Sequence, residues 1–275
     1  MRRTLLLCFV HGFKGGADTF GVRSRFALDL RQRVAAALPR VDVRLAMYPP
    51  YDTRGDLAAC VARFVDWLLE QVIDLEVAAR TPSPTVDPSV RCVLIGHSMG
   101  GIVAADALLA LAGDPRVGRG PNNDRDAEGA EGNDNDNDND KAKHTPLNAF
   151  MFPYVQGVLG LDTPYLGIAP GVVAHGAEEQ YTAASAALAQ PSSSVRTFCN
   201  LPDDDDAAAG VGEWRPAGND AATDETGAHV RMFEPATNPN YDQLVADACS
   251  MVARWTQGTA WYAGSASDGA VAQAG

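Results

Sequence analysis

One stretch of the sequence decides the fold: residues 90–101 read VRCVLIGHSMGG. Val90–Ile95 is an apolar run of strand length, and Gly100–Leu111 has the pattern of a helix. Between them lies the spacing G-x-S-x-G, with Ser98 at its centre. So sharp a turn holds the serine at positive φ and leaves no room for side chains two residues before and after it, where both positions are glycine. The stretch therefore predicts an exposed serine hydroxyl. A phosphate loop would need G-x-x-x-x-G-K-[ST] or G-x-G-x-x-G, and neither is present.

The chain on both sides of this stretch extends the same architecture. Short apolar runs alternate with longer helical patterns through the first 165 residues, which is typical of a parallel sheet covered by helices on both faces. Strands are predicted at Thr4–Val10, Val41–Met47, Val90–Ile95 and Tyr154–Leu161, and helices at Phe26–Leu38, Leu57–Ala78 and Gly100–Leu111.

The pattern weakens beyond Gly171. The predicted elements there are a helix at Ala174–Ala189, a strand at Val195–Leu201, an acidic loop at 203–228 and a closing amphipathic helix at Tyr241–Trp255. We therefore predict one α/β domain over residues 1–257, with a mostly parallel sheet. A disordered acidic insertion is expected at 113–146, because it holds few apolar groups, and a flexible tail at 258–275.

The charge of the chain is concentrated in two stretches. The net charge of the 275 residues is −13. Residues 122–143 hold eight acidic and three basic side chains, and residues 203–229 hold eight acidic and one basic. The remainder is close to neutral and has no basic surplus, whereas nucleic-acid binding depends on Lys and Arg facing phosphates. The charge pattern therefore predicts no nucleic-acid partner.

The sequence also predicts a compartment. No apolar run approaches the roughly 20 residues of a membrane-spanning helix, and the N-terminal run lacks a signal-peptide cleavage site. The five cysteines are scattered and mostly set among apolar residues, which favours free thiols. We expect a cytoplasmic protein with no transmembrane segment, and peripheral membrane contact stays open. Neither Cys-x-x-Cys nor His-x-x-x-His spacing is found, so no metal site is expected.

A second motif, His11-Gly12-Phe13, follows the first predicted strand. The negatively charged oxygen of a tetrahedral intermediate needs two converging backbone N–H donors. In this architecture one donor follows the nucleophile and the other comes from the loop after an early strand. The N–H groups of Met99 and Phe13 are the expected oxyanion hole.

These motifs resemble those of the α/β-hydrolase superfamily, and of its lipase-like serine esterases in particular. The resemblance rests on residues 11–13 (HGF), 96–101 (GHSMGG) and 162–167 (DTPYLG), the last being similar to the Thr-Pro-x-x-Gly turn common in lipases. It is specific over residues 4–171. It implies an α/β-hydrolase fold, a serine nucleophile, hydrolysis of carboxylic esters and no cofactor.

The general base can be found by elimination among five histidines. His11 and His97 belong to the two motifs, and His144 precedes the strand that leads to Asp162. His175 follows that strand too soon to return to the turn if another strand intervenes. His229 remains, late in the chain and after the candidate acids, which matches the Ser…Asp…His order of the superfamily.

The identity of the acid stays open between four aspartates. Asp162 is favoured because it follows a strongly predicted strand, where a triad acid belongs. Asp203 follows a weaker strand, and Asp220 and Asp224 lie closer to His229 along the chain.

The leading hypothesis is a serine hydrolase that acts on an ester or lipid-like small molecule. Ser98 would attack the acyl carbonyl while His229 takes its proton and Asp162 orients the imidazole. The N–H groups of Phe13 and Met99 would hold the oxyanion. A thioesterase or lipid deacylase would use the same residues, and a non-catalytic interaction protein would keep the fold alone.

Overall fold

The computed structural model describes residues 3–12, 20–21, 23–51, 56–112, 154–168, 198–199 and 212–265. These residues form an α/β fold around four parallel strands in the order β2-β1-β3-β4. The strands are β1 (Arg3–Val10), β2 (Val41–Met47), β3 (Val90–His97) and β4 (Val155–Leu161). Because the strands are parallel, their C-terminal ends meet at one edge of the sheet, where α/β proteins of this kind bind their ligands.

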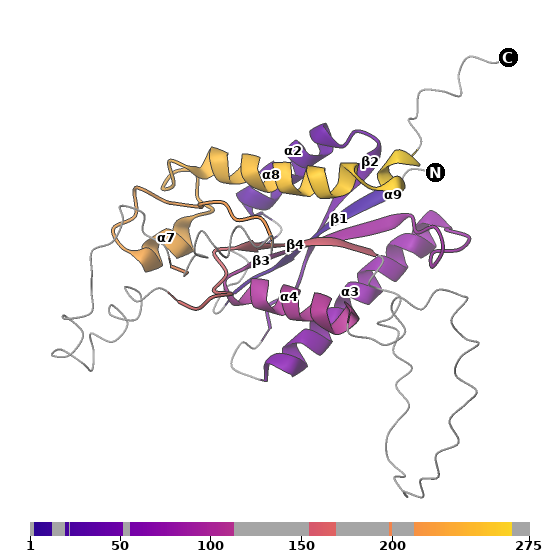
Figure 1. Cartoon of the computed structure of the whole chain (residues 1–275), viewed down its shortest axis with the longest axis horizontal. Helices are drawn as coiled ribbons and strands as arrows, with labels where there is room; N and C mark the ends of the chain where they lie inside the picture. Colours follow the sequence, from indigo (N-terminus) through magenta and orange to yellow (C-terminus); the bar gives the residue numbers. More distant parts are fainter. Residues whose placement is uncertain are drawn as a thin grey trace, which may run out of the picture.

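Helices cover both faces of the sheet (Figure 1). Helices α2 (Arg25–Ala37) and α8 (Tyr241–Gln257) pack on one face, and α3 (Leu57–Ala79) and α4 (Met99–Ala112) pack on the other. Two short helices, α7 (Glu225–Arg231) and α9 (Ala260–Ala263), flank α8. The predicted parallel sheet with helices on both faces is confirmed.

Two hydrophobic cores form because β1, an interior strand of the sheet, is apolar from Leu5 to Val10. Alternate side chains of a strand point to opposite faces, so a strand covered on both faces needs a continuous apolar run. In β1 the two sets are Leu5, Leu7 and Phe9 in the core beside α2 and α8, and Leu6, Cys8 and Val10 in the core beside α3 and α4. This rigid sheet fixes the loops that follow its strands.

The structure also describes the start of α3 and the state of the cysteines. Asp56 caps α3 by accepting hydrogen bonds from the N–H groups of Ala58 and Ala59. The described cysteines are free thiols, four of them buried. Apolar surroundings rather than disulfides therefore account for the cysteine positions.

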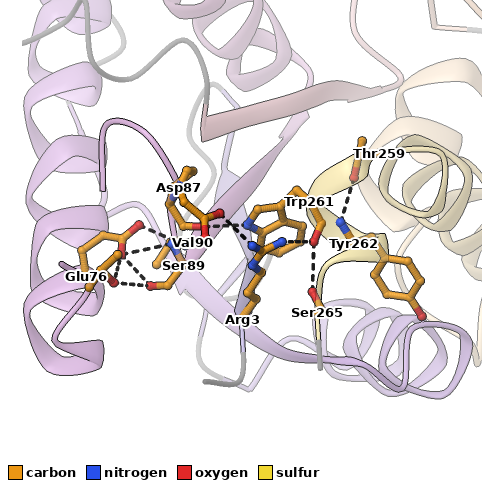
Figure 2. Close-up of polar contacts among 11 residues, drawn as sticks. Arg3, Glu76, Asp87, Ser89, Val90, Thr259, Trp261, Tyr262 and Ser265 are labelled. Atoms are coloured by element: carbon orange, nitrogen blue, oxygen red, sulfur yellow. Dashed lines mark hydrogen bonds and ion pairs between the residues drawn. The ribbon is translucent and has the colours of Figure 1, made fainter. Parts of the chain in front are cut away.

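A buried carboxylate joins α3 to the sheet at the N-terminal ends of the strands (Figure 2). Glu76 is 6% exposed. It accepts hydrogen bonds from the backbone N–H groups of Ser89 at 3.2 Å and Val90 at 3.0 Å. The hydroxyls of Ser89, at 2.5 Å, and Thr81 also donate to it. These donors compensate the cost of burying the carboxylate.

The beginning and the end of the described chain meet at this same edge (Figure 2). Arg3 donates hydrogen bonds to the Trp261 carbonyl and, at 2.7 Å, to the Asp87 carboxylate. Its guanidinium also lies over the Trp261 ring, 5.7 Å from the centroid. The indole N–H of Trp261 donates to the Pro88 carbonyl at 2.7 Å. Helix α9 thereby covers the N-terminal edge of the sheet.

The structure differs from two predictions for the C-terminal third. The expected acidic loop at 203–228 contains the start of α7, because Asp224 caps this helix by accepting a hydrogen bond from the Gly227 N–H at 2.6 Å. The expected flexible tail at 258–275 begins with α9, because Thr259 caps that helix and Trp261 is buried.

Other predictions lie outside the described residues. These are the insertion at 113–146 and the helix at Ala174–Ala189. Of the predicted strand at Val195–Leu201 the structure describes Phe198 and Cys199, and Cys199 forms an isolated antiparallel bridge with Ile168.

Candidate active site

Ser98 lies at the turn between β3 and α4, as its motif predicts. Its φ is +56°, and the described residues contain only two other non-glycine residues at positive φ, Arg80 at the end of α3 and Asp162. Such a backbone conformation is costly for a residue with a side chain and persists where the surroundings impose it. The backbone N–H of Ser98 donates to the Leu161 carbonyl at 3.1 Å, which fixes the turn against β4.

The glycines around Ser98 are required by close backbone contacts. A Cβ atom on Gly96 would lie 2.3 Å from the Gly101 nitrogen, and one on Gly100 would lie 2.2 Å from the Val10 carbonyl oxygen. A Cβ atom on Gly101 would lie 2.0 Å from the Thr163 hydroxyl oxygen. The small residues thus let α4 approach the ends of β1 and β4, and they bring three loops around Ser98.

The loop after β1 reaches the serine directly. A Cβ atom on Gly12 would lie 2.6 Å from the Ser98 Cβ and 3.2 Å from its Oγ. The first described residues of the predicted oxyanion loop therefore touch the candidate nucleophile. Phe13 itself lies outside the described residues. Met99 is the first residue of α4 and is half-buried beside Ser98. The roles of both N–H groups stay predictions.

The structure pairs the predicted base with one of the candidate acids. His229 Nδ1 and Asp162 Oδ2 are 2.7 Å apart, and the two side chains are 8% and 18% exposed. Asp162 follows β4 at a φ of +44°, and His229 lies in the last turn of α7 rather than in a loop. A carboxylate on Nδ1 fixes the imidazole and leaves Nε2 as the atom that can exchange a proton.

The other candidate acids make different contacts. Asp220 accepts a hydrogen bond from the Asn240 side chain at 2.9 Å. Asp224 is the N-cap of α7. Asp203 lies outside the described residues. Among the described candidates, Asp162 is therefore the one that contacts His229.

Two aromatic rings enclose His229. The Phe198 ring is stacked on it, with the centroids 3.8 Å apart and the planes at 17°. The His97 ring lies 4.3 Å from it at 30°. No sequence motif marks Phe198, and the available signal was the strand predicted at Val195–Leu201. With Asp162 on its edge, the imidazole of His229 has little freedom to rotate.

His97 is held in its neutral form. Burial, and secondarily the neighbouring His229, lower the pKa of His97 to about 3. The rings of Phe20 and Phe233 lie nearly perpendicular to the His97 ring, at 6.3 Å and 5.0 Å. A neutral ring at this position adds no positive charge beside His229.

The acid has a further contact from Cys199. This thiol is 4% exposed and hydrogen-bonds with the Asp162 carboxylate. Burial and the adjacent carboxylate raise the pKa of Cys199 above its ordinary range. The thiol therefore stays protonated and donates its hydrogen to Asp162, which restrains the carboxylate against His229.

Ser98 and His229 come from adjacent parts of the fold. The His97 ring, next to Ser98 in the chain, contacts His229, and Leu161, next to Asp162, accepts the Ser98 backbone N–H. In the described contacts, no hydrogen bond joins Ser98 Oγ to the His229 ring. Such bonds often shorten only when a substrate is bound.

The described residues contain no group of three or more His, Cys, Asp or Glu side chains placed to hold a metal ion. None of the described helices combines the length and apolar character needed to cross a membrane. No protein-family model matches the chain, and no curated protein is significantly similar to it in sequence.

Proposed function

We propose that this protein is a serine hydrolase of the α/β-hydrolase type that cleaves carboxylic esters. The observation that carries the proposal is a strained serine at a strand-to-helix turn, whose chain neighbour His97 packs on a buried histidine with an aspartate on its Nδ1. The three residues come from consecutive parts of one sheet edge and from α7. A phosphate-binding or purely structural turn would not need the histidine and aspartate.

The proposed reaction begins with Ser98. Its Oγ attacks the acyl carbonyl carbon while His229 Nε2 accepts the hydroxyl proton, and Asp162 stabilises the imidazolium that forms. The carbonyl oxygen becomes negatively charged and is held by backbone N–H groups, for which Met99 and Phe13 are the candidates. His229 then protonates the departing alcohol, and an acyl group stays on Ser98.

Water completes the proposed cycle. His229 accepts a proton from a water molecule, whose oxygen attacks the acyl carbon. The acid is released and the proton returns to Ser98. The neutral state of His97 favours this sequence, because a second positive charge 4.3 Å from His229 would oppose imidazolium formation.

A fluorophosphonate probe tests the proposal, because it labels an activated serine whatever the substrate. We expect covalent labelling of the full chain and its loss in Ser98→Ala. Ser250→Ala is the matched control, since Ser250 is exposed on α8, and its labelling should equal that of the unsubstituted protein. Absence of labelling on folded protein, or equal labelling of the Ser98→Ala variant, would overturn the proposal.

The type of bond needs a separate comparison. Matched oxygen and sulfur esters of one acyl group should be cleaved with kcat/KM favouring the oxygen ester. A strong preference for the sulfur ester would instead assign a thioesterase that uses the same residues.

A further inference from the structure

A cavity of about 530 Å³ opens beside the candidate active site, between the end of β2 and the first turns of α3. Its volume is within the range of small-molecule sites. Three aromatic side chains, Tyr48, Tyr51 and Trp67, form its walls together with two prolines. Asp56, Ala59 and Arg63 form the wall on the α3 side. The chemistry proposed for Ser98 uses none of these side chains.

The cavity is connected to Ser98 through one short chain of contacts. The Tyr51 hydroxyl donates to the His11 carbonyl at 2.9 Å, and the two rings are 4.9 Å apart. The next residue, Gly12, touches the Ser98 side chain. Because β1 and β2 are neighbours in a parallel sheet, their C-terminal ends lie side by side. The cavity and Ser98 therefore lie at the same edge of the sheet, separated by the His11–Gly12 segment at the end of β1.

The lining selects for a flat ring rather than an alkyl chain. The eight described lining residues include no Leu, Ile, Val or Met. Tyr48 meets Trp67 edge to face at 5.1 Å and lies tilted against Tyr51 at 5.3 Å. Aromatic walls in such arrangements favour another aromatic ring beyond the effect of apolar area alone. The ring of a ligand would complete this cluster.

We propose that the pocket formed by Tyr48, Tyr51, Ala59 and Trp67 binds an aromatic ring of the ester substrate. This assignment rests on the proposed hydrolase function, and it gives that function a substrate class, aryl-bearing esters. The ring can belong to the acyl group or to the alcohol, and both have the same chemistry in this pocket.

The test compares phenyl esters with their cyclohexyl counterparts by proton release. Methyl phenylacetate and methyl cyclohexylacetate report on the acyl side, and benzyl acetate and cyclohexylmethyl acetate on the alcohol side. We expect kcat/KM to favour the phenyl member of at least one pair by about fivefold or more. The favoured pair identifies which part of the ester occupies the pocket.

Ala59→Phe should remove this preference, because its ring would fill the pocket while the backbone N–H that Asp56 caps is retained. Methyl acetate, which has no large group to place in the pocket, is the reference substrate against which each variant is compared. Val77→Phe is the matched control on the same helix, because Val77 is 69% exposed, and the preference should survive there.

Labelling of Ser98 by the fluorophosphonate distinguishes a failure of the pocket assignment from a failure of the proposed hydrolase function. A labelled enzyme without phenyl preference, or with a preference that Ala59→Phe leaves intact, overturns the pocket assignment alone. An unlabelled, inactive chain overturns the proposed hydrolase function and the substrate class with it.

Discussion

The residues of the candidate site are held in conformations that their own chemistry disfavours. Ser98 and Asp162 both have positive φ, and each follows the last residue of a strand. The strands and the glycine contacts around them impose these backbones. The strain places the two side chains beyond the sheet edge rather than along it, which is where a substrate can reach them.

Replacement of the acid gives the sharpest residue-scale prediction. Asp162→Asn should lower kcat about a thousandfold or more, because an amide cannot stabilise the imidazolium and favours the wrong tautomer of His229. Steady-state ester hydrolysis measures the loss. Asp220→Asn is the matched control, since Asp220 contacts Asn240 instead, and its kcat should stay within about twofold of the unsubstituted value. Equal rates in both variants would remove Asp162 from the mechanism.

The neutral state of His97 predicts how stability depends on pH. Its folded-state pKa is about 3, against an ordinary value of 6.5. Between these pH values the unfolded chain binds a proton at His97 and the folded chain does not. The free energy of unfolding should therefore fall as pH drops below 6.5, with a contribution of about 1.4 kcal/mol per pH unit from this ring.

The variant His97→Gln isolates that contribution. Urea unfolding at about pH 7, 6 and 5 should give a shallower pH dependence for the variant than for the unsubstituted chain. The difference between the two slopes reports the contribution of the His97 ring. The same slope in both proteins would mean that His97 is protonated in the fold.

At the scale of elements, the two edges of the sheet have different roles. Their C-terminal ends carry Gly12, Ser98 and Asp162, and their N-terminal ends are tied to α3 and α9 by Glu76 and Trp261. Ser98 and Asp162 in the first group are strained and partly accessible, whereas the second group is satisfied and buried. Substitutions at the N-terminal edge should therefore affect stability without affecting the reaction.

Glu76→Ala tests this separation at α3. The substitution leaves four donors without their acceptor, two of them backbone N–H groups. We expect a loss of about 3 kcal/mol in the free energy of unfolding by urea titration. Glu70→Ala, at an exposed site on the same helix, should cost less than about 0.5 kcal/mol. A small loss at Glu76 would mean that water replaces the carboxylate.

The sequence could predict the elements that carry strong periodicity. The strands and the long helices were predicted to within two residues of their observed ends. Helices α7 and α9 were missed because they have seven and four residues, too short for a periodic signal, and depend on their caps at Asp224 and Thr259. The contacts of Glu76 were not predictable either, because its donors lie farther along the sequence than one helix turn.

The candidate site was predictable in its components but not in its assembly. Ser98 follows from a local spacing, and its positive φ follows from the glycines around it. The acid that pairs with His229 does not follow from nearness in sequence. Asp220 and Asp224 are nearer in sequence, and only the fold brings Asp162 to 2.7 Å from the ring. Phe198 and Cys199 carry no motif, and their contacts arise from the chain path alone.

At the scale of the whole molecule, α8 and α9 bring the end of the described chain to the start of β1. Figure 1 shows α9 beside the start of β1, with α8 running from the side of α7 to this point. The polypeptide thus crosses the sheet face from the candidate site, where α7 holds His229, to the opposite edge, where Trp261 contacts Arg3. Helix α8 packs on β4 and α2 between these points, through residues such as Val245 and Val252.

Trp261 should therefore stabilise the whole molecule although it lies far along the chain from β1. It is 6% exposed, and its indole N–H, its carbonyl and its ring all contact residues of the first 88. Trp261→Ala should lower the free energy of unfolding by about 3 kcal/mol or more. The matched variant Trp214→Ala, at a site 39% exposed, should cost less than about 1 kcal/mol. Both should keep the fluorophosphonate labelling of Ser98 under conditions where they are folded. A loss of labelling in folded Trp261→Ala protein would contradict the separation of the two sheet edges, because it would mean that the order of the candidate site depends on the opposite end of the strands.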